Sequence, residues 1–161
     1  MRQGRIAAGV VGLVAIGSLG LAGCFGPPPP APRTVNCNPS GDATPGNPAS
    51  ASNAIAECHK QVKGYTTSPG LNWSAQVEAN ERNGAVCQSG ALVHSPPGGV
   101  AENLYCWYTG GGCPASQVGA TKAMNAWLAS AGHNANINNH STVGAGVTCT
   151  NGHYFAVAHY Q

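Results

Sequence analysis

Two histidines and one glutamate, far apart along the chain, could together hold a metal ion. His94 stands in a His-Ser pair, Glu102 in a Glu-Asn-Leu triplet and His153 in a Gly-His-Tyr triplet. Imidazole nitrogens and carboxylate oxygens are common zinc ligands, and two histidines with one glutamate leave a coordination position open for water. The same side chains could instead form a hydrogen-bonded polar cluster in which Glu102 orients the imidazole rings. The sequence leaves both interpretations open.

Other polar residues give weaker signals for chemistry. Ser95 follows His94, but a serine hydrolase also needs a base facing the hydroxyl and an oxyanion hole, and the chain has no Gly-x-Ser-x-Gly motif. We interpret His133 as an imidazole placed favourably at the C-terminal end of a helix dipole rather than as a second cleft histidine. Three further histidines lack a motif and are predicted to lie at the surface: His59, His140 and His159.

Helices followed by a hairpin must position these residues. Hydrophobic periodicity predicts helices over residues 51–63, 75–86 and 115–131, the first capped by Ser52 or Asn53 and ended by Gly64. Strands are predicted around residues 102–108, 142–148 and 153–160, with Asn151-Gly152 as the turn between the last two. This order predicts an α+β fold in which helices flank a small antiparallel sheet.

The aromatic residues divide into two predicted groups. Trp73, Trp127 and Tyr154 are expected in the core, where large aromatic side chains contribute most. Trp107 and Tyr108 precede a glycine-rich loop and are expected to be exposed, where they could touch lipid or glycan.

The first 23 residues are predicted to be a secretory signal peptide. Arg2 and Arg5 precede an uncharged apolar stretch, and the run Leu21-Ala22-Gly23-Cys24 resembles the lipobox of bacterial lipoproteins. Acylated Cys24 would then anchor the mature protein to the outer face of the cell membrane. Residues 24–50 are rich in Pro, Ser and Gly and are predicted to be a tether, followed by one domain over residues 51–161.

Six of the seven cysteines remain once Cys24 carries lipid, and an even number in an exported chain indicates disulfides. None of their spacings matches a zinc ribbon or a Cys-x-x-Cys redox pair. Cys106 is predicted to pair with Cys113, because three consecutive glycines between them let the loop fold back. For the other four we expect pairs between Cys87 and Cys149 and between Cys37 and Cys58.

The charge balance excludes one class of partner. Cleavage of the signal peptide removes Arg2 and Arg5, which leaves equal numbers of basic and acidic residues in the mature chain. A nearly neutral domain has no electrostatic basis for binding nucleic acid.

An ordered series of short motifs resembles the CAP superfamily of cysteine-rich secretory, antigen 5 and pathogenesis-related proteins, in its bacterial secreted branch. The series spans most of residues 52–161: Leu71-x-Trp73, His94-Ser95, Glu102-Asn103-Leu104, Trp127-x-x-Ser130-x-Gly132-His133-Asn134, Gly144-x-Gly146 and Gly152-His153-Tyr154. The resemblance implies an α-β-α sandwich with a central cleft.

The resemblance also implies which residues line that cleft. In the family two histidines and two acids meet there, and the motifs match His94, Glu102 and His153 to three of these positions. The fourth falls at Ser130, where many eukaryotic members have a glutamate. The expected function is therefore a non-enzymatic binding module for a small lipid-like ligand, a wall component or a partner. The alternative is a zinc-dependent hydrolase of the peptidase type, with Glu102 as third ligand or general base.

Overall fold

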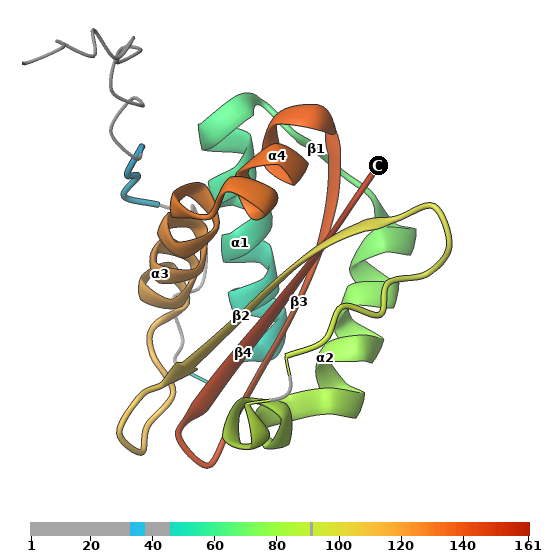
Figure 1. Ribbon diagram of the computed structural model, residues 1–161. Helices are drawn as coiled ribbons and strands as arrows, with labels where there is room; N and C mark the ends of the chain where they lie inside the picture. Colours follow the sequence, from blue (N-terminus) through green and yellow to red (C-terminus); the bar gives the residue numbers. More distant parts are fainter. Residues whose placement is uncertain (1–32, 38–45, 91) are drawn as a thin grey trace, which may run out of the picture. The chain divides into compact units, whose positions relative to one another are not determined.

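The computed structural model describes residues 33–37, 46–90 and 92–161, so the predicted signal peptide, Cys24 and most of the tether lie outside it (Figure 1). It contains helices α1 (Pro48–Lys63), α2 (Pro69–Ser89), α3 (Ser116–Ala129) and α4 (Ala131–Asn139). The strands are β1 (Thr66–Thr67), β2 (Ala101–Tyr108), β3 (Thr142–Thr150) and β4 (His153–Tyr160). None of the helices within the described ranges is long and apolar enough to cross a membrane.

The strands form one sheet in the order β1-β3-β4-β2. β4 is antiparallel to both β2 and β3, and the short β1 runs parallel to β3, so the sheet is mixed rather than purely antiparallel. Asn151, with φ 50°, and Gly152, with φ 74°, make the turn between β3 and β4. This confirms the predicted hairpin, whose turn type favours Asn-Gly because both residues need a positive φ.

Helices cover both faces of the sheet, which confirms the three-layer α+β fold. Figure 1 shows α2 on one face and α1 and α3 on the other. Alternation along the strands sorts the core residues accordingly. Leu104, Phe155 and Val157 pack against α2, whereas Tyr154, Ala156 and Tyr160 belong to the larger core beneath α1 and α3.

Close contact between α2 and β3 explains the Gly144-x-Gly146 motif. A Cβ atom at Gly144 would overlap the backbone of Leu71 and Asn72, and one at Gly146 would overlap the backbone of Ala75. Only glycine lets the helix backbone approach the strand this closely.

The helix boundaries differ from the predicted ones at the N-terminal ends. α1 begins before residue 51 because Asn47 caps it, accepting hydrogen bonds from the backbone N–H groups of Ala49 and Ser50, and it ends at Gly64 as predicted. α2 begins at Pro69, before the predicted start at residue 75, because Ser68 caps it. Proline suits this first position because it has no N–H to leave unpaired.

The third predicted helix is two helices. α3 ends at Ala129, Ser130 has the extended conformation (ψ 122°), and α4 starts at Ala131. α4 is rich in Asn and buries only Ile137, so it carries almost no hydrophobic periodicity for a prediction to detect.

The structure contains three disulfides, and two of the predicted pairings are wrong. Cys37 pairs with Cys58, as expected, whereas Cys87 pairs with Cys106 and Cys113 with Cys149. Cys106 cannot reach Cys113 because alternation along β2 points its side chain toward α2, which carries Cys87. The three disulfides indicate an oxidising, extracytoplasmic environment.

The folded region extends upstream of the predicted boundary at residue 51. Val35 exchanges two backbone hydrogen bonds with the side chain of Asn125 on α3, and Cys37 is bonded to α1. This part of the predicted tether is therefore attached to the domain.

Candidate functional site

Glu102, at the start of β2, is the centre of the candidate site. Only 4% of the residue is exposed. Its Oε1 lies 2.8 Å from Nδ1 of His94, and its Oε2 accepts a hydrogen bond from the backbone N–H of Ser95 at 3.3 Å. The His94 side chain is itself 51% exposed, so this imidazole connects a buried carboxyl group to the surface.

A cleft of about 400 Å³ opens on the α4 side of this pair. His94, Glu102, Ser130 and His133 line it, together with Asn136 and the apolar side chains of Pro96 and Val100. Ser130 reaches the cleft because it forms the bend between α3 and α4. The structure thus brings together three of the four residues that the resemblance implied.

His133 supplies the second imidazole of this cleft. It is the third residue of α4 rather than the end of α3, so its interpretation as a residue at a helix C-terminus is wrong. Its ring centroid lies 5.8 Å from that of His94. Burial lowers the pKa of His133, and the nearby His94 lowers it further, because two cations at this separation repel each other.

His153 does not reach the site. It begins β4 and pairs with Tyr108, whereas Glu102 pairs with His159 at the other end of the strand. Six residues of strand at about 3.4 Å each separate the two histidines by roughly 20 Å. His153 and His159 lie on the same face of β4, so alternation alone cannot distinguish them.

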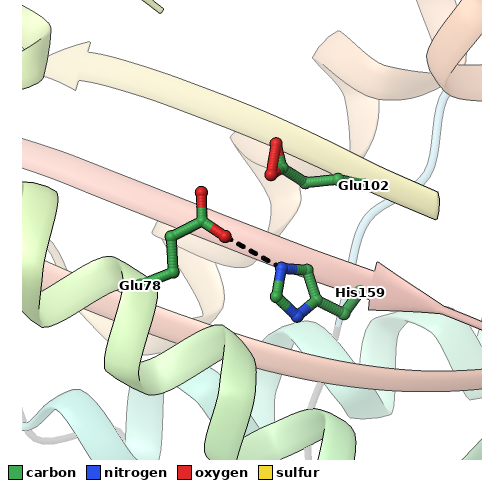
Figure 2. Close-up of side chains that lie close together, drawn as sticks. All are labelled: Glu78, Glu102 and His159. Atoms are coloured by element: carbon green, nitrogen blue, oxygen red, sulfur yellow. Dashed lines mark hydrogen bonds and ion pairs between the residues drawn. The ribbon is translucent and has the colours of Figure 1, made fainter. Parts of the chain in front are cut away.

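His159 instead joins a buried cluster on the α2 side of Glu102. Figure 2 shows Glu78 on α2, Glu102 on β2 and His159 on β4 pointing toward one another. His159 is completely buried, which contradicts its predicted surface position. Its Nε2 lies 3.0 Å from Oε2 of Glu78, and its Nδ1 lies 2.8 Å from the hydroxyl of Ser74.

The two carboxyl groups of this cluster have opposite pKa shifts. Burial raises the pKa of Glu102, and the negative charge of Glu78 raises it further. Burial alone would also raise the pKa of Glu78, but hydrogen bonds with His159, Arg82 and Glu102 outweigh it and lower this pKa. Arg82 donates to the other Glu78 oxygen at 2.5 Å. Of the two carboxyl groups, Glu102 therefore keeps its proton to the higher pH.

The donor atoms of the buried cluster are suited to binding a metal ion. One ligand atom from each of Glu78, Glu102 and His159 lies within 4.8 Å of the other two. Two carboxylates and one imidazole suit zinc or a similar divalent cation. Protons would compete with the metal for the two carboxylates and the imidazole, so metal affinity would fall at low pH.

Sequence reasoning missed Glu78 and His159, although one signal pointed to Glu78. The α2 segment is unusually polar for a helix packed on a sheet, and Glu78 and Arg82 are four residues apart on one face. His159 had no such signal. It lacks a motif and was therefore predicted at the surface, although a histidine in an apolar strand is usually a packed core residue.

A neutral hydrogen-bond network on the opposite face of the sheet holds these strands in register. Nδ1 of His59 faces the backbone oxygen of Ile55, so its Nε2 accepts from the hydroxyl of Tyr160 at 2.8 Å. Asn103 donates to the same hydroxyl at 2.9 Å and accepts from Asn136 of α4. The network therefore connects the helix that carries His133 to the strand that carries Glu102.

His59 is completely buried, so its predicted surface position is wrong. Burial lowers the pKa of His59 to about 4, and its hydrogen bond to the Ile55 carbonyl offsets this only in part. His59 is therefore neutral in the folded protein at physiological pH.

Comparisons with known proteins give similarity at the level of structure. No family model and no curated protein matches the sequence. The crystal structure of Na-ASP-1 is 17% identical over 60% of this chain, with a TM-score of 0.47. NaASP2, solved with Zn²⁺, is 18% identical over 61% of this chain, with a TM-score of 0.47.

A cysteine-rich secretory protein from Staphylococcus aureus subsp. aureus Mu50 is 14% identical over 70% of this chain, with a TM-score of 0.34. The chain spans 29%, 60% and 38% of the length of these three proteins, respectively. All three are members of the CAP superfamily, which the motif series also resembles.

Proposed function

We propose that this domain is a non-enzymatic binding module of the bacterial cell envelope, which holds a small ligand in the cleft between His94 and His133. The observation that carries the proposal is the cleft itself, in which two accessible imidazoles and a buried carboxyl converge on a space of about 400 Å³. Nδ1 of His94 is used by Glu102, so Nε2 can meet a ligand.

The mixed lining of the cleft supports a ligand with a polar head and an apolar body. The imidazoles and the Ser130 hydroxyl suit a carboxylate or hydroxyl group, while Pro96, Val100 and Ala101 offer apolar contact. A small lipid-like molecule or a wall component has this composition. Acylation of Cys24 would keep the module at the membrane surface, where such ligands occur.

A zinc-dependent hydrolase is the second candidate. The fourth cleft position is Ser130 rather than a glutamate, but the buried cluster contains a second acid, Glu78. The donors would be Glu78, Glu102 and His159 rather than the predicted set of His94, His153 and Glu102. Zinc bound there would lower the pKa of a bound water. His94, hydrogen-bonded to Glu102, would connect that site to the surface and could pass a proton.

Zinc titration separates the two candidates. Calorimetry with zinc chloride would compare the wild type with Glu102→Gln and His159→Asn. His153→Asn is the control, because it removes an imidazole from the far end of β4. One-to-one binding that only the first two variants lose would support the metal site. Absence of binding to correctly oxidised wild type would remove the hydrolase candidate.

A second titration tests the cleft. Sodium palmitate serves as the lipid-like probe and a soluble muropeptide as the wall probe, each titrated into wild type, His133→Ala and His153→Asn. We expect at least tenfold weaker binding of one probe to His133→Ala and unchanged binding to His153→Asn. Equal binding to all three proteins would contradict a ligand in this cleft.

A further inference from the structure

A second groove runs along α2, beside the loop that contains Ser95, Pro96 and Pro97. Its volume is about 370 Å³. One wall is a stripe of α2 residues spaced three or four apart: Trp73, Ser74, Val77, Glu78, Glu81 and Arg82. The nine helical rises from Trp73 to Arg82, at about 1.5 Å each, make this wall about 13 Å long. That length suits an elongated ligand better than an ion.

Trp73 is the most exposed large hydrophobic side chain in the part of the chain that the structure describes. It is 70% exposed, although the sequence predicted it in the core, whereas Trp127 is 1% exposed. A single exposed apolar residue is common, but Trp73 lines this groove together with Val77, Pro96 and Pro97. The groove therefore combines a flat aromatic ring with further apolar side chains, as ligand sites do. Its flat ring can stack against a flat, C–H-rich face, because the π face is negative and C–H groups are weakly positive.

The polar groups of the groove are side chains rather than backbone. The wall is a helix, whose interior backbone groups are used within the helix, so an extended peptide finds no strand edge to pair with. The Ser74 hydroxyl is already bonded to the Leu71 carbonyl and to Nδ1 of His159. The Ser95 hydroxyl, the exposed Glu81 carboxylate and the Arg82 guanidinium line the groove and are available for recognition. Arg82 is paired with Glu78, so Glu81 gives the groove a negative charge.

We propose that this groove binds a glycan chain, with a sugar ring stacked on Trp73 and its hydroxyl groups bonded to Glu81, Arg82 and Ser95. A hydroxyl-rich, elongated ligand without negative charge and with apolar ring faces matches the length, the aromatic surface and the polar groups of the groove. The site is separate from the His94–His133 cleft, although Pro96 lines both. It therefore extends the proposed binding function to the wall polysaccharide itself, and it does not depend on the cleft or on zinc.

Tryptophan fluorescence tests this inference directly on the oxidised protein. The probe is a soluble β-1,4-linked N-acetylglucosamine oligomer, titrated into wild type, Trp73→Phe, Trp73→Leu and Trp73→Ala. Val118→Ala is the control, because Val118 is 43% exposed and lies on α3, outside this groove. We expect saturable quenching in the wild type, about threefold weaker binding in Trp73→Phe and more than tenfold weaker binding in Trp73→Leu and Trp73→Ala, with the affinity followed by calorimetry.

The outcomes also separate a glycan from other ligands and from the cleft. If Trp73→Leu binds as well as Trp73→Phe, the surface recognises apolar groups in general, as a lipid would require, and the glycan proposal is overturned. Absence of oligomer binding to folded wild type overturns it as well. His133→Ala, which alters only the cleft, should keep oligomer binding unchanged, so failure of the proposed cleft would leave this result intact.

Discussion

The two faces of the sheet beneath the site differ in the kind of polar side chain that they bury. On β2, Glu102 points toward α2 and Asn103 toward α1, and on β4 His159 and Tyr160 divide in the same way. The α2 face collects ionisable groups that line grooves, whereas the α1 face collects a neutral network whose polar atoms bond to one another. Polar burial therefore serves stability on one face and leaves titratable groups available on the other.

Acidification should destabilise the folded protein through His59, and this is the largest effect on stability that we expect. The pKa of His59 is lowered from 6.5 to about 4 in the folded protein, so the unfolded chain binds the proton more tightly. Stability from neutral His59 is present above pH 6.5 and is lost as the pH falls through 4. Between pH 7 and 4 this amounts to about 3 kcal/mol. Urea unfolding across this range should show the loss, and His59→Gln should show a flatter pH dependence.

Removing one hydroxyl from the same network should cost somewhat less. Tyr160→Phe leaves Nε2 of His59 and one N–H of Asn103 without their partner in a buried site. We expect destabilisation of about 2 kcal/mol. Tyr108→Phe, at an exposed position, should change the free energy of unfolding by less than about 0.5 kcal/mol. Equal effects in the two variants would show that the network contributes nothing.

The two glutamates on the charged face should respond in opposite directions. The folded pKa of Glu102 lies above its unfolded value of 4.5, so its stabilising effect is present below that pH and lost as pH rises. Glu78 has a lowered pKa, so its contribution is present above pH 4.5 and lost on acidification. At pH 7, Glu102→Gln should be stabilising and Glu78→Gln destabilising, each by on the order of 1 kcal/mol. Shifts of the same sign in thermal unfolding would contradict this proton assignment.

Removing an exposed ion pair should have the smallest effect on stability, and it provides a baseline for the other variants. Lys60 and Glu57 on α1 are 2.5 Å apart, but their side chains are 40% and 34% exposed. Solvent screens such pairs, so Glu57→Ala should change stability by less than about 0.5 kcal/mol. A larger change in the same unfolding assay would mean that surface charge, rather than burial, governs these interactions.

The order of the sequence motifs predicted that His94 and Glu102 lie together, but it gave no indication that Glu78 and His159 do. His94 and Glu102 are separated by only eight residues, and a short loop into a strand brings them together with few alternatives. Glu78 and His159 are 81 residues apart, and their contact depends on how α2 lies across β4. Nothing in the local sequence states which histidine of β4 lies near Glu102, because that depends on the strand register.

The disulfides illustrate the same limit. Spacing and a glycine-rich loop favoured the local pair Cys106–Cys113, yet each of these cysteines bonds to a distant one. The side of β2 on which Cys106 lies follows from alternation, but the helix that covers that side follows from packing.

By itself the sequence determined the elements that depend on local chemistry: the Asn151-Gly152 hairpin, the helix end at Gly64 and the α+β class in which helices flank a sheet. These follow from backbone preferences and from the period of apolar residues, which act over a few positions. Only the tertiary structure decided that Glu78 and His159 meet Glu102, that His133 faces His94 and that Trp73 lies in water. Those outcomes depend on strand register and helix packing, which sum many weak contacts between segments far apart in the chain.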